Sequence, residues 1–241
     1  MKIPESLAHI IQKSANKFGY KFEPFYNPNL TNFESDVLSS VKPYTFTPIH
    51  AILSLIDSVK YIVKNDVSGC FIECGVYKGG SIMTMIKTLN ELKINDREIF
   101  LFDTFEGMPP PGKFDYRPKT GTVPNLENDE TIVSLDEVKN NVLSLEYDES
   151  KIHFIKGKVE DTLPKTELGS IALLRLDTDW YESTKIELEY LYPKLSQNGV
   201  IIIDDYESYF GAKKATDEYL NDKLYLHRIV PSGARIGIKT N

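Results

Sequence analysis

The stretch SIALLRLDTDWYESTKIELEYLYPKLSQNGVIIIDD, residues 170–205, decides the fold. Its aliphatic runs at 170–177 and 199–205 show no alternation of apolar and polar residues, which is typical of strands that are buried on both faces of a sheet. Between them, residues 183–195 have the length and composition of a helix. A strand, a helix and a second strand in this order predict a parallel β-α-β unit.

The same alternation continues in both directions along the chain. Upstream, the sequence predicts strands at 70–74, 98–103 and 151–157 and helices at 48–63, 81–93 and 134–145. Downstream, a helix at 213–221 precedes two short strands around Pro231-Ser232-Gly233, which favour a closing hairpin. The pattern predicts an α/β fold, a doubly wound and mostly parallel sheet with one antiparallel edge strand.

The predicted organisation is a helical N-terminal cap at 1–45 followed by one α/β domain at 46–241. Within this domain, residues 104–150 are too long for an ordinary connection and rich in Pro and Gly, so we expect a lid or substrate insertion there. The cap carries aromatic residues that are candidates for a homo-oligomer interface: Phe18, Tyr20, Phe22, Phe25 and Tyr26.

Composition excludes several classes of protein. A formal net charge of -7 and a pI near 5.2, with no concentrated Lys/Arg patch, disfavour nucleic-acid binding. A mean hydropathy of -0.29 disfavours a membrane protein, as does the lack of an apolar run of about 18 residues. The first residues, MKIPES, do not resemble a secretory signal, so we expect a cytoplasmic protein. Cys70 and Cys74 have no second pair to complete a zinc site, and we expect buried structural thiols.

A glycine-rich turn, ECGVYKGGS at 73–81, follows the strand at 70–74. Gly75 permits close approach of a ligand to the backbone, and Ser81 can cap the next helix. The spacing G-x-x-x-G-G is neither the dinucleotide pattern nor a P-loop, which disfavours a phosphate cradle. A turn with a purely structural role is the alternative interpretation. As a cofactor-binding loop, it offers Glu73, Gly75, Val76, Tyr77 and Ser81.

Asp103 ends the next strand, at a position where acidic side chains accept hydrogen bonds from ribose hydroxyls. Together with Glu73 it favours an adenosine ligand that carries positive charge, and S-adenosylmethionine (SAM) has a ribose, an ammonium and a sulfonium without phosphate. Helix capping beside Thr104 is the alternative role. After the third strand, Val159 is expected to pack on adenine, with Glu160 or Asp161 at its polar edge, although an ordinary capped loop fits equally. The candidate residues of this half are Asp103, Thr104, Gly157, Val159, Glu160 and Asp161.

Two pairs of aspartates follow the strands of the quoted stretch: Asp177 with Asp179, and Asp204 with Asp205. Neighbouring parallel strands would bring these carboxylates together, where they raise one another's pKa unless a cation neutralises them. Asp177, Asp204 and Asp205 are therefore candidate ligands of Mg²⁺ or another hard divalent ion. Such an ion lowers the pKa of a bound hydroxyl, so an alcohol can lose its proton to a nearby carboxylate and attack a methyl group.

The alternative for these aspartates is a structural role, as helix caps or partners of Arg175 and Lys213. Arg175 itself is expected to be either a local counter-charge or a substrate clamp.

Four motifs in order resemble the macrocin O-methyltransferase family, SAM- and Mg²⁺-dependent enzymes that methylate sugar hydroxyls of natural products. They are FIECGVYKGGSIM (71–83), LFDTFEGMP (101–109), LLRLDTDWYEST (173–184) and IIIDDYESYFGAKKATDEY (201–219). The resemblance implies a Rossmann-like class I methyltransferase fold. This sequence differs from the family pattern at two places. It has Tyr77 where the family usually has Trp, and Thr47-Pro48-Ile49-His50 where the family tends to have a Ser-Pro-Glu-Arg-like stretch.

The site residues that the resemblance implies agree with those read from the strand ends. Asp177, Asp204 and Asp205 would hold the metal, and Asp177 would also be the general base. Glu73, Gly75 and Asp103 would hold SAM, assisted by Ser81 and the 157–162 loop. Because the first forty residues and the 107–132 insertion match loosely, a macrolide acceptor is not implied.

The leading hypothesis is a metal-dependent O-methyltransferase that acts on a sugar or a glycosylated small molecule. Three alternatives stay open: a metal-independent small-molecule methyltransferase, an NAD-dependent oxidoreductase and a non-catalytic SAM-binding protein.

Overall fold

The computed structural model describes residues 30–127 and 131–240. Contacts divide the chain into two compact units, Met1–Phe33 and Glu34–Asn241, and the second contains the whole sheet. The predicted division at residues 45 and 46 stays a prediction, and the five cap aromatics lie outside the described residues. In the described part of the chain, no helix has the length and apolarity needed to cross a membrane.

A seven-stranded sheet organises this unit, in the order β3-β2-β1-β4-β5-β7-β6. Strands β1 to β5 run parallel, β7 is antiparallel to β5, and β6 is antiparallel to β7. The strands are β1 (Cys70–Cys74), β2 (Ile99–Asp103), β3 (Ile152–Lys156), β4 (Ile171–Leu176), β5 (Leu195–Ile203), β6 (His227–Arg228) and β7 (Arg235–Ile238). The prediction of a mostly parallel sheet closed by an antiparallel hairpin is confirmed.

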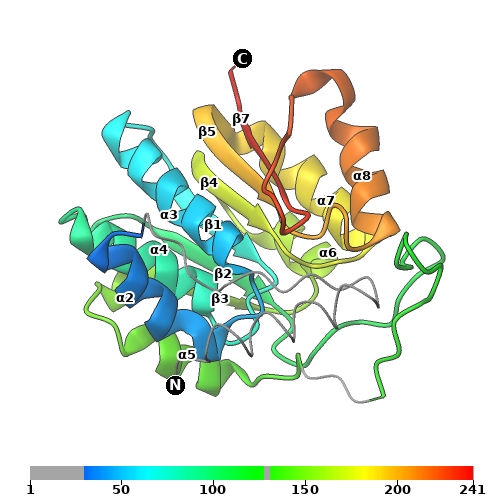
Figure 1. Ribbon diagram of the computed structural model, residues 1–241, viewed down its shortest axis with the longest axis horizontal. Helices are drawn as coiled ribbons and strands as arrows, with labels where there is room; N and C mark the ends of the chain where they lie inside the picture. The colour runs from blue at the N-terminus through cyan, green and yellow to red at the C-terminus, as the bar shows by residue number, and fades with distance from the viewer. Residues whose placement is uncertain (1–29, 128–130, 241) are drawn as a thin grey trace, which may run out of the picture. The chain divides into compact units, whose positions relative to one another are not determined.

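Helices cover both faces of the sheet, with α3 and α4 on one side and α7 and α8 on the other (Figure 1). The helices of four or more residues are α2 (Asn32–Val41), α3 (Ile49–Lys64), α4 (Gly80–Glu91), α5 (Leu135–Leu143), α6 (Val159–Thr162), α7 (Tyr181–Leu191) and α8 (Phe210–Leu220). Ile72 and Leu174 pack with Leu188 and Leu191 of α7 in one core. Every residue of β1 and β4 is buried, which explains why these strands lack polar alternation.

The elements of the quoted stretch form as predicted, but their boundaries differ, most of all at the end of α7 and the start of β5. Helix α7 ends at Leu191, four residues before the expected end, because Pro193 lies in a following 3-10 turn at Tyr192–Lys194 and cannot continue the α-helical hydrogen bonding. Strand β5 then begins at Leu195, earlier than expected. Its register with β4 pairs Leu176 with Ile203, so the two strands end level with each other.

Cys70 and Cys74 are free thiols with 8% and 0% of their surface exposed, which confirms the prediction of buried cysteines. Burial raises the pKa of Cys70 to about 11 and that of Cys74 well above its usual value. Both thiols therefore stay protonated and serve as small apolar groups of the core.

Candidate active site

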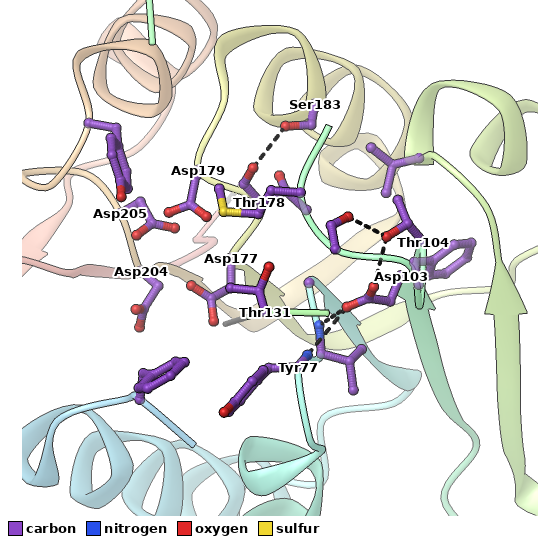
Figure 2. Close-up of a pocket in the computed structure, with 18 of the residues that line it drawn as sticks. Tyr77, Asp103, Thr104, Thr131, Asp177, Thr178, Asp179, Ser183, Asp204 and Asp205 are labelled. Atoms are coloured by element: carbon purple, nitrogen blue, oxygen red, sulfur yellow. Dashed lines mark hydrogen bonds between the residues drawn. The ribbon is translucent and has the colours of Figure 1, made fainter. Parts of the chain in front are cut away.

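A cavity of about 580 Å³ lies at the carboxyl ends of the parallel strands. The loops after β1, β2, β3, β4 and β5 all contribute to its wall, as expected for the ligand site of a doubly wound sheet. Figure 2 shows its two halves: aspartates that follow β4 and β5 on one side, and Asp103 and Thr104 on the other.

The acidic half contains the predicted carboxylates. Asp177, Asp204 and Asp205 each offer one oxygen, and these oxygens lie within 4.8 Å of one another. The backbone brings them together, because Asp177 N donates to Cys74 O (2.8 Å) and Asp204 N donates to Leu176 O (2.9 Å) at the ends of the ladder. Two neighbouring strands that end at the same level thus place three carboxylates around one point.

Arg175 of β4 is the counter-charge of this cluster, and only 2% of its side chain is exposed. Its Nη1 donates to Glu73 Oε1 and to Asp177 Oδ2, both at 2.6 Å. Its Nη2 donates to Asp204 Oδ1 (2.7 Å) and to Thr47 Oγ1 (3.0 Å). Although burial alone would lower the pKa of Arg175, the three carboxylates hold it well above its usual value.

The structure supports the counter-charge interpretation of Arg175, since the guanidinium is buried beneath its acidic partners. Lys213, the other expected partner of the aspartates, instead pairs with Asp217 on its own helix.

Burial and mutual repulsion raise the pKa values of the carboxyl groups in the acidic half. Burial, with Asp205 nearby and Arg175 opposing, raises the pKa of Asp177 to about 6. Burial and neighbouring carboxylates raise the pKa of Asp204 to about 7 and that of Asp205 well above its usual value. Asp179 joins this group from a left-handed backbone conformation (φ 65°), and burial raises its pKa to about 7.

These donors fit a hard divalent cation. Asp205 Oδ2 is buried and has no hydrogen-bond partner among the described residues, so the atom has free coordinating capacity. Asp177 and Asp204 keep 27% and 16% of their side-chain surface exposed, which leaves them accessible from the cavity. Three carboxylate oxygens beside the Arg175 guanidinium form an oxygen-only donor set of the kind that Mg²⁺ prefers.

The half of the cavity that contains Gly75 and Asp103, which the sequence assigns to the cofactor and which we name the cofactor half, depends on a close contact between the loops after β1 and β4. A Cβ atom on Gly75 would lie 1.9 Å from Asp177 O, and Gly75 has φ +81°, so glycine is required there. Asp103 joins this loop to the next one. Its Oδ2 accepts from Val76 N (2.6 Å) and Tyr77 N (3.3 Å), and its Oδ1 accepts from Phe105 N (2.7 Å).

The cavity wall includes nearly all the residues that the sequence assigns to cofactor binding. It contains Gly75, Val76, Tyr77, Ser81, Asp103, Thr104, Gly157, Val159 and Glu160. Glu73 and Asp161 are not among the described lining residues. Glu73 is 1% exposed, and burial, opposed by Arg175, raises its pKa to about 8. A direct contact between Glu73 and the cofactor stays a prediction.

Helix capping by Ser81 was expected and is not what the structure shows. Gly79 occupies the N-cap of α4 with φ 90°, and Ser81 lies inside the helix, 4% exposed, at the cavity wall. Glycine is favoured at position 79 because a left-handed backbone strains other residues.

Several lining residues were not predicted. Asp179 belongs to the D-x-D pattern after β4, so its signal was visible in the sequence. Phe46, Thr47, Arg117 and Tyr209 also line the cavity, and they come from loops without periodic patterns.

The insertion after β2 contributes Gly107, Met108, Pro109, Arg117 and Thr131 to the wall.

Buried contacts attach this insertion to the start of α7. Asp115, 2% exposed, accepts from Tyr181 N (2.8 Å) and from Gly112 N (2.7 Å). Trp180 Nε1 donates to Pro109 O at 2.8 Å. The insertion is therefore fixed against the same β4–α7 connection that carries Asp177.

The sheet order, with reversed β7 between β5 and β6, and the paired ligand loops at the strand ends define a Rossmann-like class I methyltransferase. The model of the macrocin O-methyltransferase family (TylF) matches residues 39–229. The chain belongs to this family of O-methyltransferases.

Individual relatives agree with this assignment. Demethyldecarbamoylnovobiocin O-methyltransferase of Streptomyces niveus is 33% identical over 176 residues, 73% of this chain and 67% of the relative. A 4'-O-methyltransferase of Streptomyces olivaceus that acts on 8-demethyl-8-(2,3-dimethoxy-alpha-L-rhamnosyl)-tetracenomycin C is 31% identical over 202 residues, 83% of this chain and 76% of the relative. The solved structure of the O-methyltransferase NovP matches with a TM-score of 0.73 and 30% identity, over 82% of this chain and 83% of that one.

Proposed function

We propose that the protein is a SAM-dependent and divalent-metal-dependent O-methyltransferase that acts on a hydroxyl of a sugar or glycosylated small molecule. The observation that carries the proposal is the convergence of Asp177, Asp204 and Asp205, with oxygens within 4.8 Å, in the same cavity as the Gly75 loop and Asp103. The sugar acceptor is supported by a relative whose name specifies a rhamnosyl tetracenomycin, and a small-molecule acceptor is supported by another that acts on demethyldecarbamoylnovobiocin. A cytoplasmic location and a homo-oligomer remain predictions.

In the cofactor half, we assign Asp103 to the ribose hydroxyls. Its Oδ2 already accepts two backbone N–H groups, whereas its Oδ1 accepts one, from Phe105 N. The Thr104 hydroxyl donates to Gly107 O at 2.6 Å, so one lone pair of Oδ1 is available to a ligand hydroxyl. Val159 and Glu160 would lie at the adenine, and the backbone of Gly75 at the methionyl part. SAM, when bound there, supplies a methyl group on a positively charged sulfur.

In the acidic half, Asp177, Asp204 and Asp205 would hold the metal ion. The ion supplies positive charge that lowers the pKa of an acceptor hydroxyl. Asp177 is the proposed base: its carboxylate would accept the proton of the acceptor hydroxyl, whose oxygen would take the methyl group that SAM supplies, leaving SAH. Arg175 fixes the orientation of Asp177 and Asp204 through Nη1 and Nη2, so neither carboxylate must reorganise during the reaction.

A methyl-transfer assay with and without EDTA tests the metal requirement. We expect chelation to abolish turnover and Mg²⁺ to restore it. Asp205→Asn should reduce turnover by at least about 100-fold, because it removes a proposed ligand, while the affinity for S-adenosylhomocysteine (SAH) stays unchanged. Asp136→Asn, an exposed aspartate in the first turn of α5, is the matched control and should retain full activity.

Turnover, thermal stabilisation and SAH binding together separate the alternatives. Full turnover in EDTA would indicate a metal-independent methyltransferase. Thermal stabilisation by NAD and not by SAH would indicate an oxidoreductase. Tight SAH binding without transfer to any acceptor, in both wild type and Asp205→Asn, would indicate a non-catalytic SAM-binding protein.

A further inference from the structure

Phe46 is a large aromatic residue that lies open inside the cavity. Its exposed fraction is 63%, and its ring stacks on that of Tyr77 with a centroid distance of 4.5 Å and an interplanar angle of 23°. Among the described residues, the other exposed large hydrophobic side chains are not among those that line the cavity. An apolar face left open in a site rimmed by carboxylates indicates a surface that a ligand covers.

The segment that carries Phe46 is held firmly in place. Thr47 Oγ1 accepts from Arg175 Nη2 (3.0 Å), and Thr47 N donates to Thr45 Oγ1 (2.9 Å). On the other side, the start of α4 packs closely, since a Cβ on Gly80 would lie 2.6 Å from Thr45 Cβ. The ring of Phe46 is therefore presented by a fixed backbone.

The position of Phe46 places it between the two halves of the cavity. Tyr77, on which it stacks, donates its backbone N–H to Asp103 in the cofactor half. Thr47, the next residue in the chain, is bonded to the guanidinium that also holds Asp177 and Asp204. In the view of Figure 2, Tyr77 lies below Asp177 and Asp204, and Ser183 lies at the opposite edge.

We propose that Phe46, supported by Tyr77, is the platform on which the sugar ring of the acceptor stacks. The C–H face of a sugar ring is apolar and carries partial positive charge, which complements the negative face of an aromatic ring. Its hydroxyl groups point outward along the ring edge, where Asp177 and Asp204 can accept hydrogen bonds. This inference rests on the proposed function, because it assigns the acceptor subsite of that reaction.

The test compares Phe46→Ala with Phe46→Tyr. Its probe is methyl α-L-rhamnopyranoside, a rhamnoside chosen because one relative acts on a rhamnosyl group. Binding of the probe to the SAH-loaded protein is followed by saturation-transfer NMR, and turnover is followed with SAM and Mg²⁺. Because the side chain is largely exposed, Phe46→Ala should fold normally, which the thermal melting curve checks.

We expect Phe46→Ala to weaken probe binding and raise the acceptor KM by about tenfold, equivalent to about 1.4 kcal/mol, while the Kd for SAH stays unchanged. Phe46→Tyr should keep the wild-type probe affinity and acceptor KM, because it retains the aromatic ring. The control Tyr225→Ala removes a 78%-exposed aromatic side chain outside the cavity and should change neither value.

Three outcomes would overturn the proposal: a wild-type protein that does not bind the probe, unchanged probe affinity in Phe46→Ala, or an equal loss of SAH affinity, which would assign Phe46 to the cofactor. If the wild type binds the probe through Phe46 but transfers no methyl group with any divalent metal ion, the proposed function is wrong while the sugar-binding role of Phe46 is retained.

Discussion

The substitution Arg175→Met tests the claim that one buried cation organises the site. It removes a guanidinium that is 2% exposed and is bonded to Glu73, Asp177, Asp204 and Thr47. Glu73, itself 1% exposed, then loses its ion-pair partner inside the protein. Removing one partner of a buried ion pair costs about 3–5 kcal/mol of unfolding free energy.

That loss converts to a measurable shift in melting temperature. For a chain of this length about 1 kcal/mol lowers Tm by about 2–4 °C, so Arg175→Met should melt about 6–20 °C below wild type. The assay is thermal unfolding followed by circular dichroism in EDTA. The matched control is Arg235→Met, because Arg235 is also buried but its carboxylate partner, Glu207, is 46% exposed. We expect the control to cost about 1 kcal/mol or less from its ion pair.

The two variants should also differ in metal binding. Without Arg175, Asp177 and Asp204 lose the bonds that orient them, so the affinity for Mn²⁺ should fall, whereas Arg235→Met should leave it unchanged. If Arg175→Met melts within about 3 °C of wild type, the loss is at most about 1.5 kcal/mol and the organising role assigned to Arg175 is wrong.

Two further predictions concern the loops and the core. Gly75→Ala should abolish SAH binding, because the new Cβ would lie 1.9 Å from Asp177 O. The control is Gly121→Ala, because Gly121 also has a positive φ but no described atom lies within 4 Å of a Cβ built there. The control should cost about 1–2 kcal/mol of stability and leave SAH binding intact. Equal SAH affinity in both variants would refute the close-contact argument. Glu187, 0% exposed, has a pKa raised well above 4.5 by burial, so its stabilising contribution is full at low pH and declines as pH rises above 4.5. Glu187→Gln should therefore reduce the loss of Tm between pH 5 and pH 8. The control Glu189→Gln changes an exposed residue and should leave that loss as in the wild type. Parallel plots of Tm against pH for the wild type and Glu187→Gln would contradict the raised pKa of Glu187.

The β-α-β unit was predictable because buried parallel strands have an unmistakable composition, and the level ends of β4 and β5 then follow from parallel pairing. Two local features could not be predicted from periodicity. The four-residue helix α6 is too short to show a helical period, and α7 ends earlier than its pattern indicates because Pro193 follows it.

The carboxylates of the site were predictable from the strand ends, whereas the side chains that surround them were not. Strand register does not indicate which face Glu73 occupies, so its burial against Arg175 was missed. Phe46 and Arg117 line the cavity in segments that hydrogen bonds hold in place, from Arg175 to Thr47 and from Tyr181 N to Asp115. These contacts join segments far apart in the chain. Such long-range docking leaves no periodic signal in the sequence.

The central claim is that carboxylates from two adjacent strand ends hold one divalent ion beside the cofactor. The most direct measurement is anomalous X-ray scattering at the manganese edge from crystals grown with SAH and Mn²⁺. The account predicts a single strong peak bonded to Asp177, Asp204 and Asp205 in the cavity that also holds SAH. SAH bound in that cavity with no manganese peak at these three residues would contradict it.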